Sequence, residues 1–472
     1  MSQTSSTGLP RPRIAVILAA GKGTRMRSNR PKPMHAVAGK PMLQWVIDAA
    51  RGAGCSRVLV VVGYQADVIR DAFADADVEW VLQEEQLGTG HALAQAEAQI
   101  SEDATLLVLN GDVPGLRVGT LERLAAAAEA GWGGLAVADV EPPGALGRVL
   151  ARGDRLERIV EAADATPEQL AVTLVNSGLY AVQAPRVFDD LRRLDTDNAQ
   201  GELYLTDAMG TAVEDGRPVE LVRLDDTEEA LGINDRRELA RMHRILVDRH
   251  LDDLMRSGVT ILEPARTTVE PTVRVGAETV IHPEVVLLGE TEIGPDCEIH
   301  AGCWVKDSRV ESGAVLRPHS VLEEAEVGEE CFVGPFARLR PGAELMRGAL
   351  VGNFVEMKKA RLGVGSKASH LAYIGDAEVG DGANIGAGVV TCNYDGERKH
   401  RTTIGDGAFV GSDSMLVAPV EVGAGAMTAA GSTITQDVPA GAHAVGRARQ
   451  RIVPDWAARR AERRARKASQ GE

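Results

Sequence analysis

A six-residue repeat runs through the second half of this chain. Aliphatic side chains recur at every sixth position, and glycine often follows them. This period fits neither an α-helix nor the simple alternation of a strand. It is typical of a parallel β-helix, in which three hexads form one triangular coil and the repeated residue points inward. The predicted inward residues are Val269, Val275, Ile281, Leu287, Ile293, Ile299 and Val305, then Val315, Val321, Val327, Val333, Leu339, Leu345, Val351 and Met357, and later Val379, Ile385, Ile404, Val410, Leu416 and Val422.

The repeat breaks between Thr391 and Thr403. An insertion of this kind projects from a solenoid as a loop, often on its binding face. After Pro454 the chain is rich in arginine and has a helical composition, which predicts a solvated basic helix. Contact of this tail with an acidic ligand or a neighbour is the alternative.

The first half has a different pattern. Apolar runs at 14–19, 58–62, 78–82, 106–109 and 135–140 alternate with helical stretches at 41–53, 67–74, 91–100 and 120–130. This order predicts a Rossmann-like α/β domain with a mostly parallel sheet, whose ligands bind beyond the carboxyl ends of the strands. We therefore expect an α/β domain at 1–235, a helical linker at 236–264, a left-handed β-helix at 265–453 and a basic tail at 454–472.

The overall composition excludes several classes. The net charge of −16 disfavours nucleic-acid binding, which needs a basic surface. No apolar run approaches the length of a membrane span. The odd number of cysteines, without a CxxC pair, favours reduced thiols and a cytoplasmic location. These cysteines are Cys55, Cys297, Cys303, Cys331 and Cys392.

Two segments of the first half carry candidate phosphate chemistry. Gly21 and Gly23 follow the first predicted strand, with the cations Lys22, Arg25 and Lys32 close by. Backbone N–H groups of a glycine turn and nearby cations suit a triphosphate, although each cation alone could simply be solvated. Asn110-Gly111-Asp112 follows another apolar strand. Its aspartate is placed to bind Mg²⁺, but without the glycine loop an ordinary turn would be the better interpretation.

One histidine of the repeat region stands out. His370 lies among Lys358, Tyr373 and Asn384, just before the inserted loop. An acyl transfer from a thioester to an amine needs a base, and imidazole is the usual one near neutral pH. From its chemistry, Glu356 is a candidate to orient this ring. Cys392 is the rival as an acetyl-carrying nucleophile, but direct transfer needs no carrier. We expect His282, His300 and His319 to be structural.

Three motifs resemble a known family. The segments Leu18-Ala19-Ala20-Gly21-Lys22-Gly23-Thr24-Arg25-Met26, Gln83 to His91, and Gly111-Asp112-Val113-Pro114 are similar to those of the bacterial bifunctional UDP-N-acetylglucosamine pyrophosphorylases / glucosamine-1-phosphate N-acetyltransferases, the GlmU family. The resemblance extends from Ile14 to about Arg447. It implies an enzyme that acetylates glucosamine-1-phosphate with acetyl-CoA and couples the product to UTP. UDP-N-acetylglucosamine, a cell-envelope precursor, and pyrophosphate would result.

The resemblance also implies roles in the first half. Arg25 would stabilise the transition state, Lys32 would bind phosphate, and Asp112 and Asn234 would ligate Mg²⁺. Other residues would hold the uridine nucleotide and the sugar: Leu18, Ala19, Ala20, Gly21, Gln83, Gly88, Thr89, Asn110, Gly111, Gly147, Glu161 and Asn176. The family pattern has tyrosine where this chain has Asn110, so only the backbone role of that residue is implied.

For the second half, the resemblance implies that His370 deprotonates the glucosamine amine. Arg340, Lys358, Tyr373 and Asn384 would hold the sugar phosphate. Acetyl-CoA would contact Ala387, Asn393, Tyr394, Ser412, Ala430 and Arg447. Family members are homotrimers with acyl sites between neighbouring β-helices, so the partners expected here are small substrates and two further copies.

Two alternatives remain open. A single-activity sugar-phosphate nucleotidyltransferase would use its β-helix only for assembly or regulation. A purely structural or binding protein would release no pyrophosphate from UTP. The intact set of His370, Lys358, Tyr373, Asn384 and the 391–403 loop favours two activities.

Overall fold

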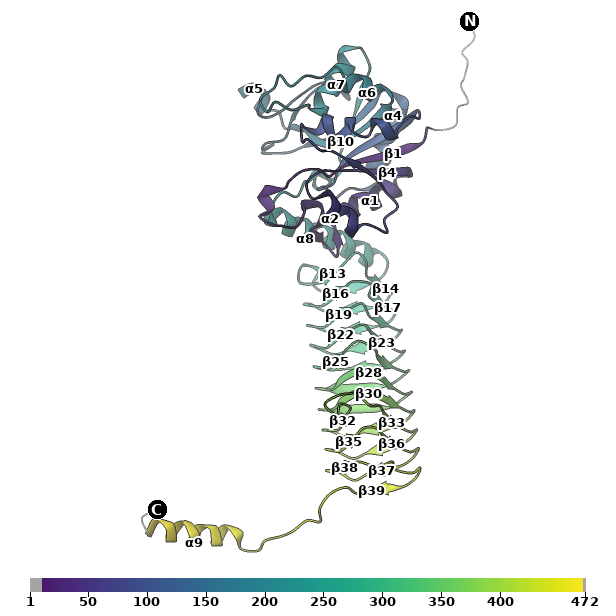
Figure 1. Cartoon of the computed structure of the whole chain (residues 1–472), viewed down its shortest axis with the longest axis vertical. Coiled ribbons are helices and arrows are strands. Elements are labelled where there is room, and N and C mark those ends of the chain that lie inside the picture. Colours follow the sequence, from purple (N-terminus) through teal and green to yellow (C-terminus); the bar gives the residue numbers. More distant parts are fainter. Residues whose placement is uncertain (1–10, 470–472) are drawn as a thin grey trace. The chain divides into compact units, whose positions relative to one another are not determined.

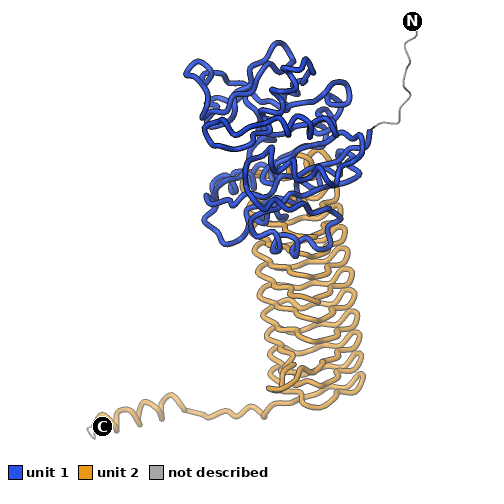
Figure 2. The backbone as a smooth tube through the Cα atoms, turned by 45° about the horizontal axis from the view of Figure 1, so that its top comes forward, with its two compact units in different colours: residues 1–250 blue, residues 251–472 orange. Residues whose placement is uncertain are grey.

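The computed structural model describes residues 11–469, which divide after His250 into two compact units (Figure 2). The division falls within helix α8 (Arg236–Arg256), which occupies much of the predicted linker. The finer boundaries predicted at residues 235 and 264 stay a prediction. Among the described residues, no helix is both long enough and apolar enough to cross a membrane.

The first unit contains a 9-stranded sheet in the order β5-β4-β1-β6-β10-β7-β11-β9-β8. Its strands β5, β4, β1 and β6 are parallel, as are β7 and β11. Because β10 runs antiparallel to both β6 and β7, the sheet is mixed and not mostly parallel as expected. The strands are β1 (Arg13–Leu18), β4 (Cys55–Val62), β5 (Glu79–Leu82), β6 (Ala104–Asn110), β7 (Gly133–Asp139), β8 (Arg148–Arg152), β9 (Arg155–Val160), β10 (Leu174–Ala184) and β11 (Val219–Arg223), beside a small hairpin of β2 (Ala36–Val37) and β3 (Lys40–Pro41).

Helices cover both faces of this sheet (Figure 1). Along β1, Ile14 and Val16 belong to one buried cluster and Ala15 and Ile17 to another, because successive side chains of a strand point to opposite faces. In α1, Leu43, Val46, Ile47 and Ala50 form one apolar stripe, which packs into the second cluster. The helices are α1 (Met42–Gly52), α2 (Ala66–Ala72), α3 (Thr89–Ala94), α4 (Val118–Ala130), α5 (Pro167–Leu170), α6 (Arg186–Leu191) and α7 (Leu205–Glu214).

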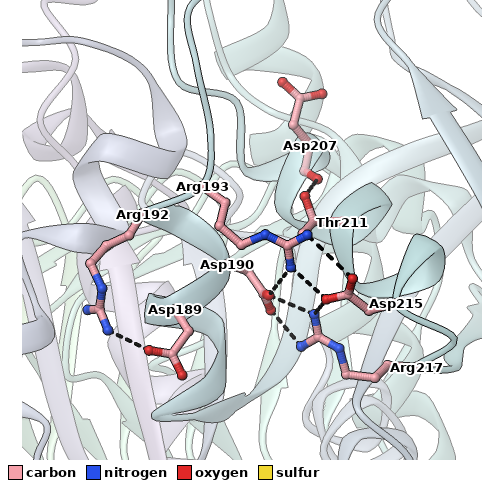
Figure 3. Close-up of polar contacts among 8 residues, drawn as sticks. All are labelled: Asp189, Asp190, Arg192, Arg193, Asp207, Thr211, Asp215 and Arg217. Atoms are coloured by element: carbon pink, nitrogen blue, oxygen red, sulfur yellow. Dashed lines mark hydrogen bonds and ion pairs between the residues drawn. The ribbon is translucent and has the colours of Figure 1, made fainter.

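An ion-pair network ties α6 and α7 to the segment before β11 (Figure 3). The Arg217 guanidinium donates to both carboxylate oxygens of Asp190 at 2.8 and 2.6 Å and to Asp215 at 2.8 Å. It also lies 5.0 Å from the centre of the Trp132 ring. Asp190 is only 2% exposed, and its other cationic neighbour, Arg193, lies farther away at 3.8 Å.

Replacing Arg217 with methionine is expected to destabilise the first unit by about 3 kcal/mol, because the buried carboxylate of Asp190 loses both of its hydrogen bonds from Arg217 and keeps only the more distant Arg193. Urea unfolding followed by circular dichroism at the helical band would measure the change, since most helices lie in this unit. Arg192→Met is the matched control, because Arg192 pairs with exposed carboxylates. Equal unfolding midpoints for the two variants would contradict the prediction.

The second unit is a left-handed parallel β-helix whose short strands repeat coil after coil (Figure 1). One face is the 11-stranded sheet β12 (Thr260–Ile261), β15 (Val280–Ile281), β18 (Glu298–Ile299), β21 (Val315–Leu316), β24 (Phe332–Val333), β27 (Leu350–Asn353), β29 (Lys367–His370), β31 (Asn384–Ile385), β34 (Phe409–Val410), β37 (Met427–Thr428) and β39 (His443–Ala444).

The other two faces share the 17-stranded sheet. One contains β13 (Thr268–Val269), β16 (Val286–Leu288), β19 (Trp304–Lys306), β22 (Val321–Glu323), β25 (Arg338–Leu339), β32 (Val390–Cys392), β35 (Met415–Val417) and β38 (Thr433–Ile434). The other contains β14 (Arg274–Val275), β17 (Glu292–Ile293), β20 (Arg309–Val310), β23 (Ala325–Val327), β26 (Ala343–Leu345), β33 (Thr402–Ile404) and β36 (Val420–Val422). The long strands β28 (Glu356–Leu362) and β30 (Tyr373–Val379) pair with neighbours on both.

The inward positions follow the predicted repeat with one shift of frame. One side of the triangular coil, between the inward residues Val305 and Val310, is one residue shorter than the six-residue repeat. Leu316 and Leu322 are therefore buried in place of the predicted Val315 and Val321. A second short side at Val327 restores the predicted frame. Val275, near the start of the β-helix, is only half-buried. The other predicted inward residues are buried.

Two predicted appendages are present. The segment 393–401 leaves the coil between β32 and β33 as a loop closed by an antiparallel bridge between Tyr394 and Lys399. The tail forms α9 (Trp456–Ser469), whose side chains are exposed throughout. Both outcomes agree with the sequence prediction.

Candidate functional site

A cavity of about 480 Å³ opens at the carboxyl ends of β1 and β6. The loop after β1, the 3-10 turns Thr24–Met26 and Lys32–Met34, the loop after β5 and the segment before α8 supply its walls. Of the residues predicted for the nucleotide site, the cavity brings together Leu18, Ala19, Ala20, Gly21, Arg25, Lys32, Gln83, Gly88, Thr89, Asn110, Gly111, Asp112 and Asn234. Lys22, predicted with the converging cations, is exposed and lies outside this lining.

Two glycines allow the close approach of these loops. Gly23 has a φ of 59°, and a Cβ there would lie 2.6 Å from the Cβ of Lys32. Gly88 has a φ of 105°, and a Cβ there would lie 2.6 Å from the carbonyl oxygen of Leu203. Any other residue would force the glycine loop from Lys32 or the β5 loop from the 200–203 segment.

Four polar side chains converge at one end of the cavity. The Lys32 ammonium contacts the carboxylate of Asp112 and donates to Asn234 Oδ1 at 3.0 Å. Arg25 donates to the same amide oxygen at 2.9 Å. The backbone bond from Ile233 N to Asp112 O, 2.9 Å long, holds Asn234 beside Asp112 although 122 residues separate them in the sequence numbering.

The pair Asp112 and Asn234 fits a Mg²⁺ ion. Both offer hard oxygen donors, which this ion prefers. The Lys32 ammonium contacts an oxygen of each residue, which shows that a positive charge is accommodated between Asp112 and Asn234.

Gly147, Glu161 and Asn176 lie together but outside the lining of this cavity. Asn176 N donates to Gly147 O at 2.9 Å, and Glu161 Oε1 accepts from Thr206 Oγ1 at 3.2 Å. A Cβ on Gly147 would lie 3.2 Å from Glu161 Oε2. Burial raises the pKa of the Glu161 carboxyl, and the nearby carboxylates of Asp207 and Asp164 raise it further.

Asn110 links this group to the cavity. Its amide donates to Gly178 O at 3.2 Å, while Gly178 N donates to Asn176 Oδ1 at 2.9 Å. The side chain that departs from the family pattern therefore serves a local backbone contact at the boundary of the two groups.

Sequence reasoning missed several lining residues. Gln86 Nε2 donates to Ala20 O at 2.8 Å, which joins the loops after β5 and β1. Glu202 also lines the cavity, because the backbone of Leu203 pairs with Leu87 and Gly90 at 2.8 Å. Gln86 lay within a recognised motif and could have been selected, whereas no signal near Glu202 indicated this contact. Gly23 of the predicted glycine turn also lines the cavity, and the remaining additions are Thr24, Pro33 and Ala92.

In the β-helix, His370 ends β29 and is exposed. Its Nδ1 lies 2.6 Å from Asn353 Oδ1, one coil away. This contact fits a neutral ring whose Nδ1–H donates to the amide oxygen, which leaves Nε2 free to accept a proton. The suggestion that Glu356 orients the ring is wrong, because Glu356 instead accepts from Arg340 at 2.7 Å.

Cations gather beside this histidine's coil. The nearby ammonium of Lys399, in the inserted loop, and the guanidinium of Arg340 lower the pKa of Lys358. A group of like charges without an anion is costly, so the cluster suits a phosphate. Lys399 was not selected from the sequence. The hydroxyl of Tyr373 and the amide of Asn393 both lie over Gly375, where a Cβ would meet them at 2.5 and 2.8 Å.

The residues predicted for acetyl-CoA fall into two groups. Ala387, Ser412, Ala430 and Arg447 follow one edge of successive coils: Asp413 N donates to Ala387 O at 2.6 Å and Gly431 N to Ser412 O at 2.8 Å. Asn393 and Tyr394 lie in the inserted loop, where Asn393 Nδ2 donates to Asp376 at 2.6 Å. Asn384 begins β31 and pairs with Lys367 of the strand that ends at His370.

Cys392 is a poor nucleophile in this setting. Burial raises the pKa of its thiol, which reduces the thiolate fraction at neutral pH. The five cysteines are unpaired.

Comparison with known proteins supplies the family context. A model of MobA-like NTP transferase domains matches residues 15–209, and a model of bacterial transferase hexapeptide repeats matches residues 401–436. The bifunctional protein GlmU of Pelobacter propionicus is 47% identical over 414 residues, which cover 87% of this chain and 90% of that protein. A crystal structure of UDP-glucose pyrophosphorylase complexed with UDP-glucose aligns at 19% identity and a TM-score of 0.41, over 50% of this chain and 98% of that chain.

Proposed function

The chain belongs to the GlmU family, and we propose that each of its two units catalyses one step of the same synthesis. It is a bifunctional enzyme: it acetylates glucosamine-1-phosphate with acetyl-CoA and then couples N-acetylglucosamine-1-phosphate to UTP. The cavity that contains Asp112 lies in the first compact unit and His370 lies in the second. This separation is the observation that supports one activity in each unit.

In the first unit, the nucleotide lies in the cavity above the glycine loop. A phosphate oxygen of the sugar phosphate attacks the α-phosphorus of UTP, and the bond to the β-phosphate oxygen breaks to release pyrophosphate. Arg25 and Lys32 face this reaction and stabilise the charge that develops on the phosphates. Gln83, Gly88 and Thr89 hold the uracil, and Gly147, Glu161 and Asn176 hold the N-acetylglucosamine. Asp112 and Asn234 would hold Mg²⁺, which would neutralise the triphosphate charge when bound.

In the second unit, the sugar amine attacks the thioester carbonyl carbon of acetyl-CoA. His370 Nε2 accepts the ammonium proton, the carbon–sulfur bond breaks, and the leaving thiolate is protonated to CoA. Arg340 and Lys358, with Lys399, bind the sugar phosphate, while Tyr373 and Asn384 complete the pocket. Ala387, Asn393, Tyr394, Ser412, Ala430 and Arg447 hold acetyl-CoA. Both co-substrates are cytoplasmic metabolites, which supports a cytoplasmic location.

Incubation with glucosamine-1-phosphate, acetyl-CoA, UTP and Mg²⁺ tests this function. Mass spectrometry should find UDP-N-acetylglucosamine, CoA and pyrophosphate together. Pyrophosphate released from UTP and N-acetylglucosamine-1-phosphate, without CoA release from acetyl-CoA and glucosamine-1-phosphate, would support the single-activity alternative.

Replacing Glu161 with glutamine should weaken the binding of N-acetylglucosamine-1-phosphate but raise the thermal stability of the protein at neutral pH. Because the folded-state pKa of Glu161 is raised, its ionised form costs stability, and the cost grows as pH rises through the window above about 4.5. Glu161→Gln should therefore melt higher than the native protein at neutral pH and lose this advantage near pH 4.5. It should also raise the KM for N-acetylglucosamine-1-phosphate about tenfold, because a charged acceptor is lost. An unchanged KM would remove Glu161 from the sugar site.

We further propose that three copies assemble through the β-helix. His319, Phe336 and Phe354 stack along one corner with ring centres 5.1 and 5.4 Å apart, and Leu371 follows in the next coil. Phe354 and Leu371 are 55% and 62% exposed, next to His370. An exposed apolar stripe of this kind suits contact with another chain.

Phe354→Glu should reduce the mass in solution from three times 50.1 kDa to that of one chain and abolish acetyl transfer, while uridylyl transfer persists. Glutamate is compatible with this corner backbone, since Glu284 has a φ of 64° close to the 57° of Phe354. Val364→Glu, at another exposed site, is the control for light scattering. A native protein of single-chain mass would contradict the trimer.

A further inference from the structure

Two histidines and a glutamate form a cluster on one face of the β-helix, away from His370. His282 follows β15 and His300 follows β18 one coil later, where Ile281 pairs with Ile299. Glu298 Oε1 lies 3.2 Å from His282 Nε2 and 3.5 Å from His300 Nε2. Both imidazoles therefore direct the same ring nitrogen toward one carboxylate oxygen.

We propose that His282, Glu298 and His300 bind a divalent transition-metal ion of the zinc class. Imidazole nitrogens with one carboxylate oxygen are a set that Zn²⁺ favours, while Mg²⁺ prefers oxygen donors alone. The site is thus chemically distinct from the pair Asp112 and Asn234. Under this proposal His282 and His300 are metal ligands and not only structural residues as the sequence predicts. His319 instead stacks against Phe336.

The separations of the donor atoms support this assignment. Ligands about 2.0–2.1 Å from a tetrahedral Zn²⁺ lie about 3.3 Å from one another. The two distances from Glu298 Oε1, 3.2 and 3.5 Å, already have this value. All three donor atoms lie within 4.8 Å of one another, so a small movement of one ring would complete the set.

The backbone and the surroundings hold the donors in place. His282 N donates to Ile299 O and His300 N to Leu316 O, both at 2.9 Å, so the ladder of the coil fixes both residues. The side chains of His282 and His300 are about one quarter exposed, at 26% and 27%, which leaves an open side for water or another ligand.

The role of this ion would be to clamp two coils. From Ile299 the register passes through Leu316, Val333 and Val351 to Ala368, which is four coils or about 19 Å along the axis. The proposed site is therefore too far from His370 to take part in acetyl transfer. Zn²⁺ should raise the melting temperature of the second unit and leave both activities unchanged.

Calorimetric titration of the full-length, chelator-treated protein with zinc chloride tests the proposal. Saturating Mg²⁺ is present throughout, so that oxygen-donor sites are already filled. We expect one Zn²⁺ per chain, and binding at least tenfold weaker in His282→Gln, His300→Gln and Glu298→Gln. Cobalt(II) should give visible d–d absorption in the native protein that each substitution removes.

The conservative variant Glu298→Gln and one control variant make the result decisive. Glu298→Gln keeps the size of the side chain and covers the case in which a histidine variant does not fold. His400→Gln removes another imidazole–carboxylate pair, His400 with Asp395 at 2.6 Å, and should bind Zn²⁺ as the native protein does. Absence of stoichiometric binding to the native protein, equal affinity in all variants, or loss only in His400→Gln would each overturn the proposal.

Discussion

Replacing Asp112 with asparagine is expected to reduce uridylyl transfer by at least about 100-fold and to leave acetyl transfer unchanged. The substitution keeps the shape of the side chain but removes the negative charge that contacts Lys32 and that, with Asn234, would hold Mg²⁺. Pyrophosphate release from UTP and N-acetylglucosamine-1-phosphate would measure the first activity. CoA release from acetyl-CoA and glucosamine-1-phosphate would measure the second.

Asp139→Asn is the matched control for this experiment. Asp139 also ends a strand of the same sheet, but its side chain is exposed and pairs with Arg223 at 2.8 Å. Both activities should survive in this variant. Loss of both activities in a well-folded Asp112→Asn protein would contradict the separation of the two sites.

The reverse pattern is expected for His370→Asn. Loss of a general base should lower acetyl transfer by about 100-fold to 10,000-fold, while uridylyl transfer stays at the native rate. Asn353→Ala should lower the kcat of acetyl transfer about tenfold with little change in KM, because it only releases the ring from its orientation. Asn353→Asp retains an acceptor for Nδ1–H and should recover most of the rate.

His443→Asn provides the control, since His443 lies exposed in the last strand of the β-helix. The same coupled CoA assay serves all four variants. A native rate of acetyl transfer in His370→Asn would show that another group, such as Cys392, accepts the proton or carries the acetyl group.

Local patterns explain what the sequence could predict. The glycine loop after β1 and the aspartate after β6 are recognisable because each follows an apolar strand, and parallel neighbours place their ends together. The β-helix is predictable because each coil repeats an aliphatic residue at the position that points inward. Which residues point inward is harder to predict, because the shortened side before Val310 moves the buried positions to Leu316 and Leu322 and nothing in the composition marks this shift.

Long-range contacts explain what was missed. Asn353 escaped selection although it lies 17 residues before His370, the length of one coil at that point. Knowledge of the coil length would have predicted their contact. Glu202 reaches the nucleotide cavity only because Leu203 pairs with the loop after β5, and nothing in its own segment indicates this. The antiparallel position of β10 likewise depends on the assembled sheet.

One chain thus carries two independent sites joined by a freely released N-acetylglucosamine-1-phosphate. Mixing purified Asp112→Asn and His370→Asn proteins with glucosamine-1-phosphate, acetyl-CoA, UTP and Mg²⁺ tests this arrangement. The mixture should form UDP-N-acetylglucosamine, whereas the first variant alone should accumulate N-acetylglucosamine-1-phosphate and the second alone should form almost no product. A mixture that forms no more UDP-N-acetylglucosamine than either variant alone would contradict this arrangement.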